Sequence, residues 1–213
     1  MGTEEKSVKD LKLIGGKLCL DFTNTVDGHR LTCPVEQLTS YDELVSWSEH
    51  AGVLDAAVAS QLHQKANDYP DTAAAVLKRA ITLREAIYRI FSAIANGRKP
   101  PAKDLALLND ELALESPKRH VVLSKEGFTY DWGRDRAALD WMVAPIVQSA
   151  ADLVTSDELA RVKQCDAYDC GWLFFDQSKN RSRRWCDMKG CGNRAKARRC
   201  YTRKCSSDKS GAC

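Results

Sequence analysis

The chain has 213 residues, a net charge of +3 and 44% hydrophobic residues, enough for one domain with a buried core and a second small module. It contains no run of about eighteen apolar residues, so we expect no membrane span and no membrane partner. The N-terminal residues lack the apolar segment of a signal peptide. We therefore expect a cytoplasmic protein whose nine cysteines are reduced or bound to metal rather than paired in disulfides.

The first ordered stretch, residues 13–26, reads LIGGKLCLDFTNTV. A Gly-Gly turn before an apolar run indicates a strand or the start of a hairpin. Asp21, Asn24 and Thr25 are polar residues inside this apolar segment. They either line a ligand pocket or cap the following turn, because Asp, Asn and Thr side chains readily bond to local backbone.

The pattern becomes helical at Ser40, which forms a capping-box signature with Glu43. The longest helix is expected from Thr72 to about Asn96, because its apolar residues recur with a 3.6-residue period and Gly97 then stops it. The expected helices cover approximately residues 40–52, 55–67, 72–96, 103–114 and 135–153.

Arg84 interrupts the apolar stripe of the longest expected helix. A charge on a buried face needs a partner, which either Asp21 or an anionic ligand would supply. Alternatively, the side chain reaches out from the edge of the stripe to solvent. Asp21, Asn24, Thr25 and Arg84 are therefore the candidate residues for binding a small-molecule effector.

A hairpin is expected between the last two of these helices, with strands 120–124 and 128–132 and a turn at 125–127. We consider pairing of this hairpin with residues 18–22 in a small sheet. The following helix is expected to be capped by Asp135 and kinked by Pro145.

Four cysteines near the C-terminus form two Cys-x4-Cys pairs separated by fifteen residues: Cys165 with Cys170, and Cys186 with Cys191. Zinc favours four thiolates in a tetrahedron, and two close pairs joined by a loop supply them. The alternative is four ordinary buried or free cysteines, which fits a single pair better than two equal ones. The spacing predicts a structural zinc site, because four protein ligands leave no open position for water or substrate.

The insert between the pairs reads as a hairpin of its own. Residues 172–175 are strand formers, residues 176–180 are rich in turn formers, and residues 184–186 return. A knuckle containing Gly190 and a basic helical segment follow. This order is the outline of a treble-clef zinc finger.

The remaining cysteines complicate the choice of ligands. Cys200 and Cys205 repeat the same spacing, but they lie within or just past the basic segment, and we expect them to be free thiols, as is Cys213 at the end of the chain. Cys19 is expected in the core and Cys33 in a loop.

Residues 191–194, Cys-Gly-Asn-Arg, resemble the signature of the CGNR zinc-finger family, and residues 172–176 and 182–186 are similar to that family too. The resemblance covers residues 161–204. It implies a bacterial transcription regulator in which the finger binds DNA.

Residues 20–25 and 83–88 resemble the ABATE domain, the usual N-terminal companion of the CGNR finger. We therefore expect a mainly α fold with a small β component. Its parts are an ABATE-like helical domain at 1–158, a treble-clef zinc finger at 159–205 and a tail at 206–213.

Charge is distributed unevenly along the chain. Residues 161–205 hold 13 Lys and Arg against 4 Asp and Glu, a net charge of +9, whereas residues 1–160 carry −6. A basic module on an acidic body is typical of nucleic-acid binding, although a solvated basic tail is the alternative. Asn193 and Arg194 either read bases or support the zinc knuckle. The candidate DNA-binding residues are Arg183, Arg184, Asn193, Arg194, Lys196, Arg198 and Arg199.

No GxSxG, phosphate-binding or dinucleotide-binding motif occurs, and the four histidines have no metal-ligand spacing. We therefore expect no enzyme, although an enzyme in the N-terminal domain is the third interpretation. The leading one is a DNA-binding transcription regulator controlled by a small-molecule effector. The second is a zinc-finger module that binds protein or RNA without recognising duplex DNA.

Overall fold

The computed structural model describes residues 7–115, 120–125, 127–131 and 137–208. In these residues the fold is mainly helical, with short two-stranded ladders, as predicted. None of the helices described is long and apolar enough to cross a membrane. The helices are α1 (Leu18–Thr23), α2 (Tyr41–His50), α3 (Ala56–Asp68), α4 (Pro70–Ala95), α5 (Ala102–Glu115), α6 (Val143–Val154) and α7 (Asn193–Asp208).

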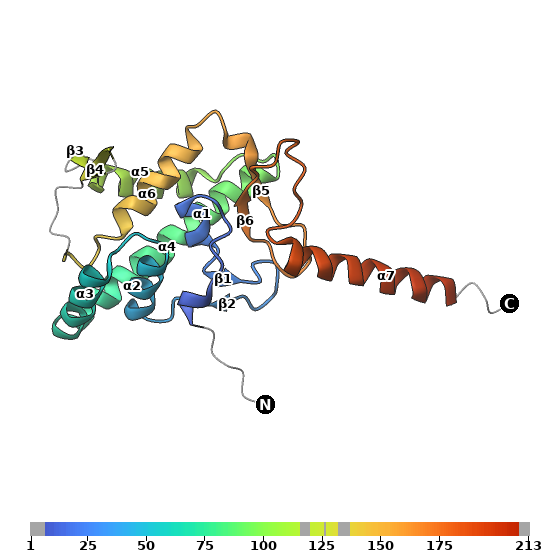
Figure 1. Ribbon diagram of the computed structural model, residues 1–213, viewed down its shortest axis with the longest axis horizontal. Helices are drawn as coiled ribbons and strands as arrows, with labels where there is room; N and C mark the ends of the chain where they lie inside the picture. Colours follow the sequence, from blue (N-terminus) through green and yellow to red (C-terminus); the bar gives the residue numbers. More distant parts are fainter. Residues whose placement is uncertain (1–6, 116–119, 126, 132–136, 209–213) are drawn as a thin grey trace.

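Helix α4 is the central element of the N-terminal domain (Figure 1). At 26 residues it is about 39 Å long, and it contacts α1, α2, α3, α5 and α6. Its buried side chains follow the predicted stripe, and Gly97 ends it with a φ of 67°. Arg98 N–H then donates to Ala93 O at 2.8 Å, which satisfies a terminal carbonyl of the helix.

The starts of α2 and α3 are set by local side chains, as predicted. Ser40 Oγ accepts from Glu43 N–H at 3.2 Å, and Glu43 Oε2 accepts from Ser40 N–H at 3.0 Å, completing the capping box. Asp55 caps α3 by accepting from Val58 N–H at 2.9 Å.

The strand expected within residues 13–26 is wrong, because residues 18–23 form helix α1. Leu18, Leu20 and Phe22 alternate with other residues as in a strand, but Cys19 is fully buried as well. A short run buried on several sides does not reveal its period, and packing against α4 and α6 selects the helix.

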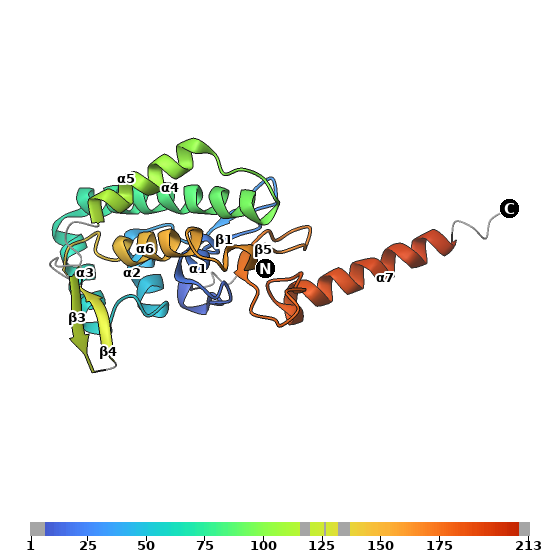
Figure 2. The ribbon, with the colours of Figure 1, turned by 90° about the horizontal axis from the view of Figure 1, so that it is seen from above.

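The hairpin expected at residues 120–132 is present as β3 (His120–Ser124) and β4 (Gly127–Asp131). These strands pair only with each other in the part of the chain that the structure describes, so the predicted pairing with residues 18–22 is wrong. Both views place the hairpin at the opposite end of the molecule from α7 (Figures 1 and 2).

Helix α6 begins at Val143, later than predicted. Pro145 therefore lies in its first turn, where the missing N–H breaks no intrahelical bond, and the expected kink does not arise. Glu126 in the predicted turn, Trp132 and Asp135 lie outside the described residues.

The finger region is packed onto the N-terminal domain rather than tethered to it. Strands β5 (Val162–Gln164) and β6 (Leu173–Phe175) form an antiparallel ladder that contacts α4. Val162, Leu173 and Phe175 belong to the same hydrophobic core as the helices. Helix α7, in contrast, extends away from the rest of the molecule (Figures 1 and 2).

Candidate metal centre and nucleic-acid interface

The first pair of cysteines lies in the turn that joins β5 to β6. Cys165 directly follows β5, and its N–H donates to Trp172 O at 2.8 Å, which closes the turn. Gly171 follows Cys170 with a φ of 86°, a conformation that L side chains rarely adopt. The hairpin predicted inside the insert is therefore wrong. Strand β6 pairs with the preceding strand, β5, and residues 184–186 form no strand.

The second pair is presented by a five-residue π-helical turn, η4 (Met188–Gly192). Asp187 caps this turn by accepting from Lys189 N–H at 2.9 Å, and Gly192 N–H donates to Asp187 O at 3.0 Å. A Cβ on Gly192 would meet Met188 Sδ at 2.6 Å, so a larger residue at this position of the Cys-Gly-Asn-Arg motif would require the Met188 side chain to move.

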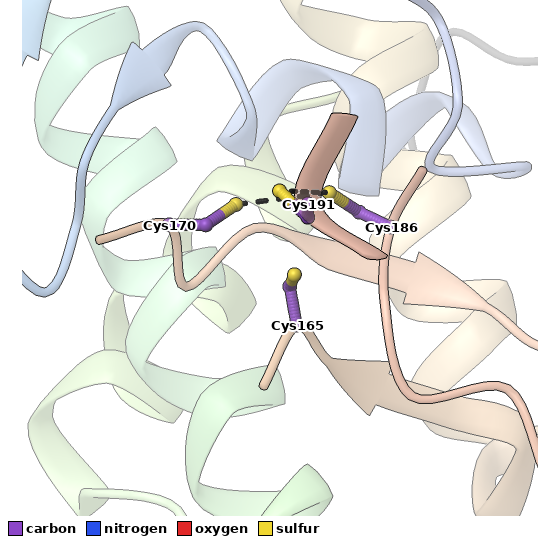
Figure 3. A group of neighbouring side chains, drawn as sticks. All are labelled: Cys165, Cys170, Cys186 and Cys191. Atoms are coloured by element: carbon purple, nitrogen blue, oxygen red, sulfur yellow. Dashed lines mark hydrogen bonds between the residues drawn. The ribbon is translucent and has the colours of Figure 1, made fainter. Parts of the chain in front are cut away.

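The four cysteine side chains point toward one another from separate segments, as Figure 3 shows. All four are buried, and their sulfur atoms lie within 4.8 Å of one another. Cys186 Sγ is 3.7 Å from Cys170 Sγ and 3.6 Å from Cys191 Sγ. Four sulfurs at about 2.3 Å from a tetrahedral zinc ion are about 3.8 Å apart. Cys165, Cys170, Cys186 and Cys191 are thus positioned to bind one zinc ion.

The electrostatics of the cluster lead to the same conclusion. Hydrogen bonds from Cys170 and Cys186 lower the pKa of the Cys165 thiol, and donating these bonds raises the pKa of both donors. Without a cation, the cluster therefore favours one thiolate and protonated neighbours. Four thiolates at this separation need a divalent ion to offset their repulsion.

Groups outside the cluster support its sulfurs. Trp172 N–H donates to Cys170 Sγ at 3.5 Å. Arg194 Nη2 lies 3.3 Å from Cys191 Sγ, and its guanidinium pairs with Asp169 at 3.4 Å. With every sulfur committed to the metal, the site cross-links the chain and has no position for a reacting substrate.

The predicted DNA-binding arginines do not all point the same way. Arg183 turns toward the finger itself, where its guanidinium donates to Trp185 O at 2.9 Å and to Cys186 O and lies 4.4 Å from the Phe174 ring centroid. Arg184 is exposed, and its Nε donates to Asp166 at 2.8 Å.

Helix α7 carries the other candidates on its exposed surface. Arg198 stacks on Tyr168 with 3.9 Å to the ring centroid, and Arg199 lies 5.9 Å from the Trp185 centroid. Asn193 and Lys196 are exposed on the same helix. A groove of about 470 Å³ runs between the first knuckle and α7. The cations lining it are Arg184, Arg194, Arg198 and Arg199.

The candidate effector residues are bound to other parts of the protein. Asn24 Nδ2 donates to Leu173 O at 2.8 Å, and Asn24 Oδ1 accepts from Leu173 N–H at 2.9 Å. Asp21 accepts from Gly15 N–H at 2.7 Å. Burial raises the pKa of Asp21 to about 6, although N–H groups of the glycines oppose that rise.

Arg84 is buried, and its partner is Glu36 rather than the expected Asp21. Its two terminal nitrogens each lie 2.6 Å from a Glu36 carboxylate oxygen, and further bonds join it to Thr25 Oγ1 at 3.1 Å and Glu85. Burial pushes the pKa of Glu36 upward, but the hydrogen bonds and charge of Arg84 outweigh burial and hold it below its usual value.

Sequence reasoning missed two supporting carboxylates, Glu36 and Asp176. Asp176 is fully buried and accepts from Ser178 N–H and Arg183 N–H, both at 2.9 Å, so it fixes the loop after β6. A charged residue directly after an apolar strand was the available signal for Asp176. Glu36 lies 48 residues from Arg84, and no local signal joins them.

The other cysteines lie apart from the cluster. Cys19 is buried in the core and Cys33 lies in a loop, as predicted, and Cys200 is an exposed free cysteine on α7. The side chain of Cys205 and all of Cys213 lie outside the described residues.

Comparison with known families gives two matches. Residues 16–157 match the ABATE family, whose description is "putative stress-induced transcription regulator", and residues 161–204 match the CGNR zinc finger. No curated protein matches the chain.

Proposed function

The chain belongs to the ABATE family and carries a CGNR zinc finger, and on this basis we propose that it is a transcription regulator whose finger binds duplex DNA. The observation that carries the proposal is a basic helix, α7, extending from a metal-fixed base (Figure 1). Lys196, Arg198 and Arg199 are exposed on it and suit contacts to phosphate. Asn193 and Arg194 would either contact the bases directly or support the zinc knuckle beside the DNA.

We propose a narrower set of DNA contacts than the full list of candidate residues. Arg184, Arg194, Arg198 and Arg199 surround one groove, and three of them lie within cation–π distance of an aromatic ring: Arg198 of Tyr168, and Arg184 and Arg199 of Trp185. Arg183 binds backbone carbonyls of the finger, so we assign it the role of shaping the finger.

Selection of bound sequences from random duplex DNA, with and without zinc, tests this function directly. We expect enrichment of a short sequence by the zinc-loaded protein, with affinity that falls steeply as salt rises. Replacing Arg184, Lys196, Arg198 and Arg199 together by alanine should abolish binding while zinc content stays at one per chain. Retention of full affinity would contradict the proposal. If competitor RNA displaces the duplex, while added salt hardly weakens duplex binding, the alternative of an RNA-binding finger is favoured.

The proposal includes control by a small molecule, and we infer that this molecule binds where the finger packs against the N-terminal domain. A recess of about 470 Å³ borders the metal ligands and is lined by Leu11, Ile14, Leu31, Val35 and Trp172 among others. Its volume falls in the range of small-molecule sites. A thermal-shift screen with Leu31→Trp, which fills the recess, tests the assignment. Ligand shifts that the substitution leaves intact would contradict it.

A further inference from the structure

A second recess, of about 270 Å³, lies where the finger meets the N-terminal domain. The loop after β6, strand β5, the loop after strand β1 (Val26–Asp27) and the C-terminal end of α4 surround it. Five of its side chains are cationic: Arg30, Lys163, Arg181, Arg183 and Arg184. Its single carboxylate, Asp166, is already paired with Arg184.

Three of these cations have no acidic partner in the part of the chain that the structure describes. They are Arg30 and Arg181, which are exposed, and Lys163, which is half-buried. Like charges gathered round one recess repel one another, and an anion with several acceptor oxygens would relieve that repulsion.

The surrounding structure positions Arg30 and the loop that carries Arg181. Arg30 donates to Ala167 O at 3.4 Å, and its Cγ would lie 3.0 Å from a Cβ at Gly171, so it packs against a position that must stay glycine. Buried Asp176 fixes the loop that carries Arg181. Arg181 itself has a φ of 49°, an uncommon conformation for a residue other than glycine.

The location of the recess indicates which anion it takes. Arg184 and Asp166 line both this recess and the groove beside α7, so the two form one continuous basic surface. We propose that the recess binds a backbone phosphate of the same duplex, through Arg30, Lys163 and Arg181. This inference rests on the proposed function and adds that the N-terminal domain contacts DNA through Arg30.

The test compares the salt dependence of duplex binding, measured by fluorescence anisotropy, for the wild type, Arg30→Ala/Arg181→Ala and a control. The control, Lys78→Ala/Lys125→Ala, removes two exposed charges outside both recesses. We expect the first variant to lower the log–log slope by about one unit, as for one lost phosphate, and the control to leave it unchanged. Arg30→Lys/Arg181→Lys should restore most of the slope, and melting temperature and zinc content should match the wild type. An unchanged slope in Arg30→Ala/Arg181→Ala would overturn the inference.

A second experiment distinguishes whether the recess binds a phosphate of DNA or the phosphate of a free molecule. Inorganic pyrophosphate is titrated in a thermal-shift assay without DNA. If pyrophosphate binds the wild type but not Arg30→Ala/Arg181→Ala, while the duplex slopes agree, the recess belongs to a free phosphorylated molecule and the duplex contact is overturned. If the wild type binds no duplex at all, the proposed function fails, and the pyrophosphate arm still shows whether the recess is an anion site.

Discussion

Asn24 joins the N-terminal domain to the finger through both polar atoms of one side chain. It is buried, and it makes the two hydrogen bonds to Leu173 that a neighbouring strand would make. Asn24→Ala leaves a backbone N–H and a carbonyl buried without partners. We expect a loss of about 2–4 kcal/mol in the free energy of unfolding, measured by urea denaturation.

The matched control is Asn193→Ala, since Asn193 is exposed at the start of α7, and it should change stability by less than about 0.5 kcal/mol. A loss below that value for Asn24→Ala would show that the two hydrogen bonds do not hold the finger in place.

Asp21 makes stability depend on pH in an unusual direction. Burial raises its pKa in the folded protein to about 6, so the folded state holds the proton more tightly than the unfolded state. Its contribution is therefore unfavourable above pH 6 and is relieved as pH falls toward 4. We expect wild-type stability, measured relative to Asp21→Asn, to rise by on the order of 2 kcal/mol between pH 7.5 and pH 4.5. A relative stability that falls over this interval would contradict the assignment.

At the scale of residues, sequence predicted what depends on local chemistry. The zinc ligands followed from the spacing of the cysteines, the insert between the two pairs and the family motif, and the structure places all four in one cluster. The partners of Asn24 and Arg84 lie 149 and 48 residues away. A polar residue in an apolar segment indicates that a buried partner is needed, but only the tertiary structure shows which residue it is.

Among the elements, α7 is the least supported by packing. It is polar on all sides and extends from η4 (Figure 2). Arg194 and Lys196 lie in its first turn, where the positive end of the helix dipole disfavours cations. Most helices in proteins gain their stability from packing rather than from helix propensity, and isolated helices shorter than about 12–15 residues are marginal in water, a limit that α7 barely exceeds. A polyanion alongside would offset both the dipole and the mutual repulsion of the basic side chains.

We therefore expect duplex DNA to stabilise α7 itself. Amide hydrogen exchange in residues 195–208 should slow by at least about tenfold when duplex is added, whereas exchange in α4 should hardly change. The measurement is exchange followed by mass spectrometry, with Arg184→Ala/Arg198→Ala/Arg199→Ala as a binding-deficient control. Equal protection of α7 with and without duplex would mean that the helix is already stable, or that DNA binds elsewhere.

The elements that sequence predicted well are those with their own start and stop signals. Helices α2, α3 and α4 carry caps or a terminal glycine within a few residues of their ends. Helix α1 has no such signals, and its state depends on packing against α4 and α6. The strand state of β6 was predicted from its residues, but its pairing with β5 was not, because the partner of a strand is not a local property of the sequence.

The whole molecule separates its charge along its length. The basic finger lies at one end and the acidic helical body at the other (Figure 1). Such a separation would orient the molecule as it approaches a polyanion, with α7 and the basic face of the finger leading.

The finger is also part of the core of the whole molecule, so we expect zinc to stabilise more than the finger. Leu173 and Phe175 pack in the main core, Phe175 N–H donates to Gly15 O at 2.7 Å, and Trp172 Nε1 donates to Val26 O at 2.8 Å. Loss of the metal frees the turn that carries these residues. Structural zinc sites contribute folding free energy directly. Here we expect part of this contribution to stabilise the helices as well, because the metal-fixed turn carries residues that contact them.

Cys170→Ser should therefore lower the melting temperature of the helical domain itself, followed by circular dichroism at 222 nm. Loss of about 2 kcal/mol from these contacts corresponds to roughly 4–8 °C for a chain of this size. Cys200→Ser, at an exposed cysteine outside the cluster, is the matched control and should melt like the wild type. Chelation of zinc from the wild type should reproduce the shift, and added zinc should reverse it. If the melting temperature at 222 nm is unchanged when bound zinc falls to zero, the finger folds as a separate unit and its contacts do not stabilise the helical domain.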